Sequence, residues 1–232
     1  MKKAIFGSIL AMVSVSTEAA TVNWGAGTDN GFNDSNGADL GQLNLARVGF
    51  FDVSDALLFS NRFDVSFLDS HFTEFASTTI GSNFGLDGHF TASSNANPAA
   101  TGGITASIVG AQMYYWILSS TNKSSTALAL SSATAQGVFY VNKLNNSSWA
   151  FPSQTPVPGF TTTDLTDLTD AGGGVLAPGA TVVIGSFNTT PGGVSDASGA
   201  PNFQLAAVPE PTSVFLIAAG AAGLMMRRRR QS

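Results

Sequence analysis

The sequence predicts an all-β fold, a single-domain β-sandwich of the jelly-roll-like type with long loops, and three observations support this prediction. Short apolar runs rich in Val, Ile, Phe, Tyr and Trp recur along the chain and have the length of strands. Clusters of Gly, Pro and Asn bound most of these runs, as turns between strands do. Only the two ends of the chain have the composition of apolar helices. We therefore expect helix only in an N-terminal signal and in a C-terminal segment.

The strand-sized runs follow one another through a single domain, which we place at residues 21–190. They cover residues 45–51, 57–59, 63–68, 104–109, 113–118, 127–130, 138–141, 148–151 and 181–187. Residues 70–78 form the one stretch whose pattern would also fit a helix. Residues 151–171 and 191–201 are dense in Pro, Gly, Ser and Thr, so we expect long loops there. Residues 191–207 would then form a flexible stalk after the domain.

The first 20 residues have the pattern of a cleaved secretory signal. Lys2 and Lys3 precede an apolar run at residues 4–15, and small residues then lead to polar Thr21. As a helix this run rises only about 18 Å, short of the ~30 Å hydrocarbon core, which disfavours a permanent anchor. We therefore predict a signal peptide over residues 1–20, with the Sec translocon and signal peptidase as partners.

The other end of the chain carries a second apolar run, at residues 214–226, between a proline-rich segment and a basic tail. A helix over 213–226 would be only about 20 Å long, which suits a temporary membrane span better than a lasting one, although a plain anchor is an alternative. The basic tail should stay cytoplasmic, so the domain lies on the far side of the membrane. The flanking residues are Val208, Pro209, Glu210 and Pro211 before the run and Arg227, Arg228, Arg229 and Arg230 after it.

This arrangement over residues 208–232 resembles the PEP-CTERM sorting signal. The resemblance implies that an exosortase-type membrane enzyme, a transpeptidase or protease, recognises Pro209, Glu210 and Pro211 and cleaves nearby. It also implies export through the inner membrane of a Gram-negative-type bacterium, and a place at the cell surface or in the extracellular polysaccharide matrix of a biofilm. Blocks such as RVGFFD and QMYYWI look like the body of other PEP-CTERM cargo proteins, but no activity follows from that similarity.

The net charge of the domain limits the classes of molecule that we expect it to bind. Residues 21–207 hold four basic and 13 acidic residues, a net charge of −9. Such a surface excludes nucleic acid as a partner and favours neutral extracellular polysaccharide or cations. Because the chain has no Cys, disulfides and Cys-ligated metals are excluded. We expect membrane contact only through the terminal helices.

Two acidic segments could present oxygen ligands to calcium, although we expect no cofactor. The first is Asp34, Asn36 and Asp39 around a glycine, and its alternative is an Asx-rich turn between strands. The second is Asp164, Asp167 and Asp170, and its alternative is a solvated loop. His71 and His89 lack the HExxH pattern of a zinc helix, so we expect both at the surface.

Four aromatic residues are candidate contacts for a glycan, because aromatic faces stack on sugar rings. They are Trp24, Tyr115, Trp116 and Trp149, and the alternative for each is packing in the core. Strand alternation places Tyr115 and Trp116 on opposite faces of one strand. An enzyme is not expected, because no motif marks a carboxylate pair and no Gly-x-Ser-x-Gly elbow is present.

From the sequence we therefore expect a non-catalytic structural or adhesive protein. The alternative is a lectin-like, carbohydrate-binding β-sandwich, and its dependence on calcium is left open.

Overall fold

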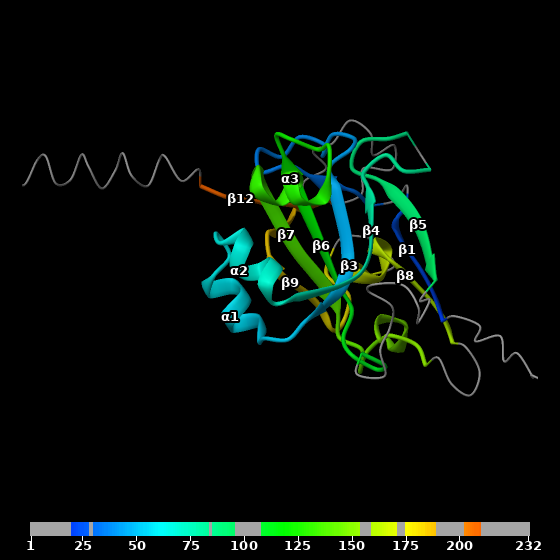
Figure 1. Cartoon of the computed structure of the whole chain (residues 1–232). Helices are drawn as coiled ribbons and strands as arrows, with labels where there is room; N and C mark the ends of the chain where they lie inside the picture. Colours follow the sequence, from blue (N-terminus) through cyan, green and yellow to red (C-terminus); the bar gives the residue numbers. More distant parts are fainter. Residues whose placement is uncertain are drawn as a thin grey trace, which may run out of the picture.

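The computed structural model describes residues 20–27, 30–83, 85–95, 108–153, 159–170, 175–188 and 202–209. These residues form several sheets with a few short helices, which confirms the all-β, sandwich-like class (Figure 1). The elements are β1 (Thr21–Ala26), β2 (Phe32–Asn33), β3 (Leu45–Phe51), α1 (Asp55–Ser60), α2 (Val65–Ser70), β4 (Phe72–Thr79), β5 (Phe90–Asn95), β6 (Tyr114–Ser120), α3 (Thr126–Ser131), β7 (Ala133–Val141), η1 (Ser147–Trp149), β8 (Phe160–Asp164), η2 (Leu165–Leu168), β9 (Ala180–Ile184), β10 (Ser186–Asn188), β11 (Asn202–Gln204) and β12 (Ala206–Ala207).

The largest sheet is the centre of the domain. Its strand order is β12-β7-β6-β3-β4, and β9 also pairs with β7. The pairs β3·β4, β3·β6, β6·β7, β7·β9 and β7·β12 are all antiparallel. Two three-stranded sheets, β5-β1-β8 and β10-β11-β2, complete the architecture. In Figure 1, α1 and α2 lie at the left of the central sheet and α3 lies over its upper part. The strands β5, β1 and β8 lie at the right, beyond β4.

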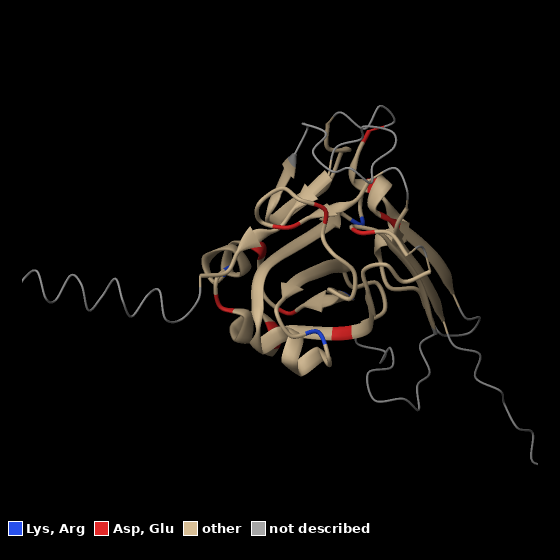
Figure 2. Cartoon of the chain, turned by 90° about the horizontal axis from the view of Figure 1, so that it is seen from above, with Lys and Arg blue, Asp and Glu red and all other residues tan. Residues whose placement is uncertain are grey.

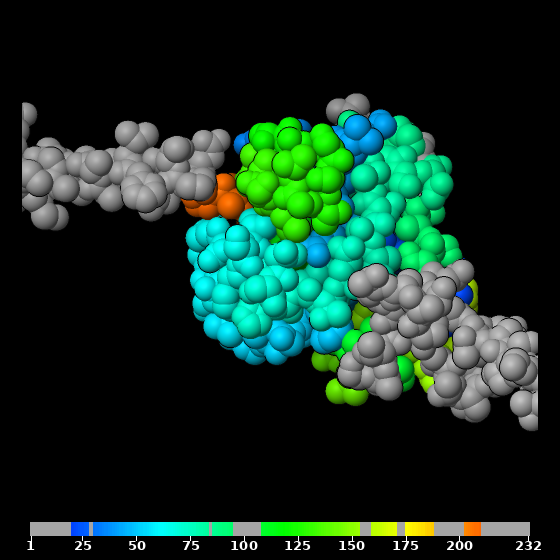
Figure 3. Space-filling model, viewed as in Figure 1, coloured from blue at the N-terminus to red at the C-terminus, as the bar shows by residue number. Residues whose placement is uncertain are grey.

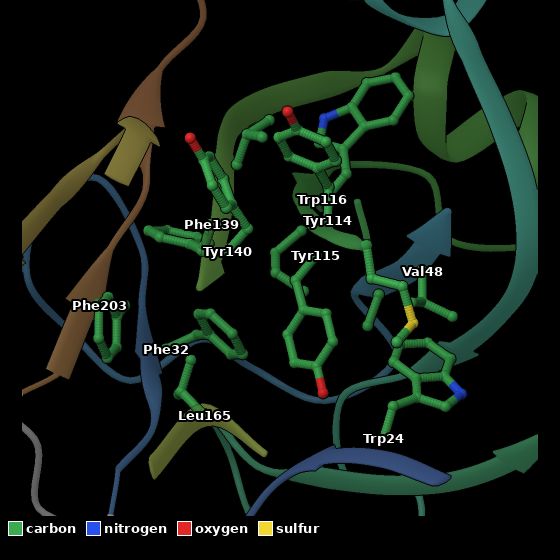
Figure 4. Packing of buried hydrophobic residues seen from close by; sticks show 14 of the residues in the cluster. Trp24, Phe32, Val48, Tyr114, Tyr115, Trp116, Phe139, Tyr140, Leu165 and Phe203 are labelled. Atoms are coloured by element: carbon green, nitrogen blue, oxygen red, sulfur yellow. The ribbon is translucent and has the colours of Figure 1, made fainter. Parts of the chain in front are cut away.

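Both faces of the central sheet are buried. Along β6, Tyr114, Tyr115, Trp116, Ile117 and Leu118 are all buried, whichever face they point to. Figure 4 shows Trp116 on one side of the strand and Tyr115 on the other, with the Tyr115 ring pointing toward Trp24 of β1. The Trp24 and Tyr115 ring centroids lie 5.8 Å apart. The helices cover the Trp116 face, and the smaller sheets cover the Tyr115 face.

The hydroxyl of Tyr115 joins the central sheet to the β5-β1-β8 sheet. It accepts a hydrogen bond from the Gly25 backbone N–H at 3.1 Å and lies 2.9 Å from the Thr163 carbonyl oxygen, to which it donates. Gly25 belongs to β1 and Thr163 to β8, so one side chain contacts two strands of the opposite sheet. Burial raises the pKa of Tyr115 far above its ordinary value.

Three segments that the sequence analysis assigned to strands are helices. Residues 57–59, 63–68 and 127–130 lie in or beside α1, α2 and α3, so helix is not confined to the two ends of the chain. Each helix begins at a side chain that accepts a backbone N–H, namely Ser54, Asp64 or Ser125. Each helix has only six residues and one buried side chain. Its sequence is therefore too short to show the 3.6-residue repeat of apolar positions that identifies a helix. Conversely, residues 70–78 are mostly the edge strand β4.

Three other expectations about secondary structure along the chain were wrong. The expected loop at 151–171 contains β8 and η2, and the expected strand at 148–151 begins inside η1. The end of the expected stalk, 202–207, forms β11 and β12, because Phe203 and Leu205 are buried in the core, 0% and 2% exposed. Residues 1–19, 104–107, 191–201 and 210–232 lie outside the described residues.

Within the ranges listed above, no helix combines the length and apolar character needed to cross a membrane.

Alkaline titration tests the burial of the tyrosines, of which the chain has three. Burial raises the pKa of Tyr114, Tyr115 and Tyr140 above the ordinary 10.0. Above about pH 10 the folded state therefore binds more protons than the unfolded state, so stability falls as the pH rises. We expect tyrosinate absorbance to appear together with loss of the native circular dichroism, whereas the urea-unfolded chain should titrate normally. A gradual rise near pH 10 in the folded protein would contradict this packing.

Candidate functional site

The first acidic segment is organised as a turn. The Asp34 carboxylate accepts hydrogen bonds from the backbone N–H groups of Asn36, at 2.8 Å, and Ala38, at 3.1 Å. Asp39 lies opposite Asn33 in an isolated bridge. This is the geometry of the Asx turn that was the alternative to a calcium loop. One oxygen of Asp34 is thus engaged by the loop itself, and calcium binding here stays a prediction.

The second acidic segment caps a helix. Asp164 and Asp167 form a capping box at the start of η2. The Oδ2 atom of Asp167 accepts hydrogen bonds from the Trp149 indole N–H at 2.9 Å and from the Asp164 backbone N–H at 3.0 Å. Asp170 accepts a long bond from the Val175 backbone N–H instead. Across the described part of the chain, no three His, Asp or Glu side chains converge as they would around a metal.

The four candidate glycan contacts lie in the core, which overturns that prediction. Trp24 is 2% exposed, and Tyr115, Trp116 and Trp149 are 0% exposed, so none of these rings can stack on a sugar in solution. The aromatic rings instead pack on one another, as the T-shaped contact between Trp24 and Phe90 at 5.1 Å illustrates. The alternative of core packing is therefore correct for all four.

The two histidines differ in burial. His71 is partly exposed, and its Nδ1 lies 2.7 Å from a carboxylate oxygen of Asp52. His89 is only 1% exposed, so the expectation of a surface position was wrong for it. Its Nδ1 lies 2.6 Å from the Gly27 carbonyl oxygen, and this bond allows the ring to be buried.

Sequence reasoning missed a buried cation on the helix-covered face of the central sheet. Arg47 of β3 is 5% exposed, and its guanidinium bonds the carboxylates of Asp69 and Glu74. The same guanidinium lies over the rings of Trp116, at 4.6 Å, and Phe72, at 4.7 Å. The sequence feature that could have indicated this buried cation is the single basic residue within the apolar run 45–51. Asp69 belongs to α2, so this cluster fixes that helix to the sheet.

Three further hydrogen bonds fix the segment 55–70, which we call the α1–α2 hairpin. Asp55 accepts hydrogen bonds from the hydroxyls of Tyr140, at 2.6 Å, and Tyr114, at 3.1 Å. The Arg62 carbonyl oxygen accepts a bond from the Gln136 side chain at 2.7 Å. Each contact joins the hairpin to β6 or β7, so its position on the sheet is set at several points.

A shallow pocket of about 250 Å³ lies where β3 and β4 meet α3. Hydroxyl groups and a few apolar side chains line it, and no Asp, Glu or His is among them. Lys123 at its rim donates a hydrogen bond to the Gln42 carbonyl oxygen at 2.9 Å. The lining residues are Leu43, Leu45, Ser77, Thr78, Thr79, Lys123, Ser124, Ser125, Thr126 and Ala129.

The domain ends immediately before the predicted processing signal. Ala206 and Ala207 of β12 pair with Gln136 and Ala135 of β7, and the Val208 backbone N–H bonds the Thr134 carbonyl oxygen at 2.8 Å. Of the predicted signal residues, the structure describes only Pro209, which is exposed; Glu210, Pro211 and the four arginines lie outside the described residues. The signal therefore follows the last strand with no stalk between them. Figure 3 shows the segment 202–209 (orange) beside the α1–α2 hairpin (cyan).

Comparison with known proteins assigns the C-terminal segment. A family profile described as the PEP-CTERM protein-sorting motif matches residues 207–230. Neither curated proteins nor solved structures gave a match to this chain. The motif indicates an exported protein that is sorted by exosortase, a membrane enzyme, and it implies anchoring at the cell surface.

Substitution of Arg47 tests the buried cluster. Arg47→Met leaves Asp69 and Glu74 without their cation, and breaking a fully buried pair costs about 3–5 kcal/mol. Because both carboxylates are partly exposed, we expect a smaller loss of about 2–3 kcal/mol in the free energy of urea unfolding. Arg47→Lys should fall between, because an ammonium lacks the fork that reaches both acids. A loss below about 0.5 kcal/mol for Arg47→Met, the scale of an ordinary surface substitution, would show that the cluster does not hold the hairpin.

Proposed function

For a chain that carries a PEP-CTERM sorting motif, we propose that the folded domain is a non-catalytic structural or adhesive protein of the cell surface or extracellular matrix. The motif itself accounts for export and sorting. The proposal concerns what the domain does after it has been delivered. The proposal rests on which side chains are exposed at the surface of the domain and which are buried in its core.

The burial of every Trp and Tyr carries this proposal. The chain has three of each, and none is more than 9% exposed. A lectin site would need an exposed aromatic face beside polar groups. With these rings in the core, the lectin alternative loses its predicted contacts, and a described surface that exposes no Trp or Tyr ring favours a structural role.

The use of the carboxylates supports a non-catalytic role. Asp64, Asp164 and Asp167 cap helices, Asp55 and Asp69 hold the α1–α2 hairpin on the sheet, and Glu74 of β4 pairs with Arg47. Glycoside hydrolysis instead needs two carboxyl groups about 5–9.5 Å apart that face a substrate across a cleft. Figure 2 shows the acidic residues spread around the domain. The hydroxyl-lined pocket beside α3 has none.

The acidic, hydroxyl-rich composition suits a matrix of neutral polysaccharide. A net charge of −9 over residues 21–207 keeps copies of the domain apart in solution and repels anionic polymers. Serine, threonine and asparagine side chains can exchange hydrogen bonds with hydrated polymer without a dedicated pocket. This behaviour fits a component of a coat or matrix.

Changing the processing signal tests delivery. Replacing Pro209, Glu210 and Pro211 together by alanine should remove what exosortase recognises, while leaving β12 on β7 intact. We expect unprocessed precursor to accumulate in the membrane fraction, detected by immunoblot and by mass spectrometry of the C-terminus. Pro178→Ala, outside the motif, should mature as the natural chain does. Normal maturation of the triple variant would refute the sorting mechanism.

A glycan array tests the role of the domain against the lectin alternative. The processed protein, fluorescently labelled on lysine, should bind no defined glycan above background, with or without millimolar calcium. The reason is that its Trp and Tyr rings are buried. Saturable binding to one glycan class would overturn the structural role. Binding only in calcium would point to the segments at Asp34 or Asp164.

A further inference from the structure

Exposed aromatic side chains gather on the α1–α2 hairpin. Phe59 is 53% exposed, Phe63 49% and Leu57 42%; among the other described aromatic residues only Phe160 of β8 is exposed, and it stands alone. The Arg62 guanidinium lies between the two rings, 4.3 Å from the Phe59 centroid and 4.4 Å from that of Phe63. We call Leu57, Phe59, Arg62 and Phe63 the aromatic patch. Its rings contribute little to the core, and their exposure calls for a partner.

The aromatic patch lies on the side of the domain where the folded chain ends. The Arg62 carbonyl oxygen bonds the Gln136 side chain, and Gln136 pairs directly with Ala206 of β12. The last strand and the hairpin are therefore joined through one residue of β7. Figure 1 shows β12 near α2, with β5, β1 and β8 toward the opposite side, and Figure 3 shows the two surfaces adjoining.

The length of chain after β12 limits how far this side can be from a membrane. Only residues 210–213 separate Pro209 from the apolar run 214–226. Four residues span at most about 14 Å even when fully extended. When the apolar run is inserted, the side of the domain that carries β12 must lie close to the lipid headgroups.

We propose that the aromatic patch rests in the headgroup region of the lipid bilayer, on the side away from the cytoplasm, as long as the sorting segment is attached. The proposal rests on the proposed function, because it requires an exported chain held by its sorting segment. It replaces the expectation that only the terminal helices contact the membrane. Its occupant is lipid, and the exosortase is the alternative that the experiment separates.

The chemistry of the patch fits such an interface. Phenylalanine and leucine side chains can insert at the boundary between headgroups and acyl chains, and an arginine beside them can reach anionic lipid phosphates. Arg62 donates one hydrogen bond, to the Phe59 carbonyl oxygen at 3.0 Å, and so stays within the patch. Of the other described bases, Arg47 is buried, and Lys123 and Lys143 each donate to a backbone carbonyl. The neighbouring Asp64 carboxylate accepts the Phe67 N–H as the cap of α2, and Asp55 is held by two tyrosines.

Contact at this patch would also fix the orientation of the processing signal. A domain held only by a four-residue tether could rotate freely above the bilayer. A second contact point on the hairpin removes that freedom, so that Pro209, Glu210 and Pro211 meet a membrane enzyme in one orientation.

Because the chain has no cysteine, single cysteines can report on each side of the domain. We would place an environment-sensitive fluorophore at Ser66→Cys on α2, near the patch, and at Thr162→Cys on β8 as the matched control; both residues are exposed. The full chain, sorting segment intact, is reconstituted into vesicles of phosphatidylethanolamine and phosphatidylglycerol. We expect the Ser66→Cys label to shift to shorter wavelength and to be quenched by brominated lipid, and the Thr162→Cys label to stay as in water. Adding Phe59→Ser and Phe63→Ser should abolish the shift while near-UV circular dichroism confirms the fold.

The other outcomes overturn the proposal in distinguishable ways. A chain that floats with vesicles while the Ser66→Cys label stays in water rejects the patch alone. A chain that does not float rejects the insertion of the sorting segment and the patch with it. Equal shifts at both positions reject a specific side. A shift that appears only when exosortase is present assigns the patch to the enzyme in place of lipid.

Discussion

The structure depends on one constraint, which is that the central sheet has no face for water. Tyr114–Leu118 in β6 are buried without interruption, so each face of the strand needs a covering layer. An antiparallel sheet usually leaves one face solvated and alternates apolar with polar residues. Here the smaller sheets cover the Tyr115 side and the helices cover the Trp116 side. The domain is thus a sandwich with a third, helical layer. The short helices shield the Trp116 face of the sheet from water.

The helical layer is too small to be held by apolar contact alone. Each helix has six residues and one buried side chain, Leu58, Leu68 or Ala129, far fewer than a helix of ordinary length offers. Polar contacts supply the remainder, through Arg47 and Asp55 and through a backbone carbonyl. Hydrogen bonds to charged groups contribute about 1.5–3 kcal/mol each, more than neutral ones. The same contacts engage the carboxylates of Asp55 and Asp69.

The sequence predicted the strands that are marked by a long apolar run. It missed the short helices and the short strand β11, whose patterns cover too few residues. The runs 45–51, 113–118 and 138–141 fall in or beside β3, β6 and β7, and each was identified because it is a mostly apolar run of strand length. The six-residue helices could have been found only from their caps, such as Ser54, since their apolar residues also fit a strand. β11 was missed because loop composition around it outweighed the alternation of buried Phe203 and Leu205. Contacts with the rest of the fold decide whether such short segments form a helix, a strand or a loop.

The candidate site was predictable where a motif is local and unpredictable where the fold must assemble it. The sorting signal is contiguous in sequence, so its motif could be recognised without a structure. The burial of Trp116 and the pairing of Arg47 with Asp69 depend on residues brought together by the fold, and neither is a local property. The position of the signal is also a property of the fold. Ala206 and Ala207 of β12 complete the edge of β7, so the sheet extends to the residue at which the sorting motif begins.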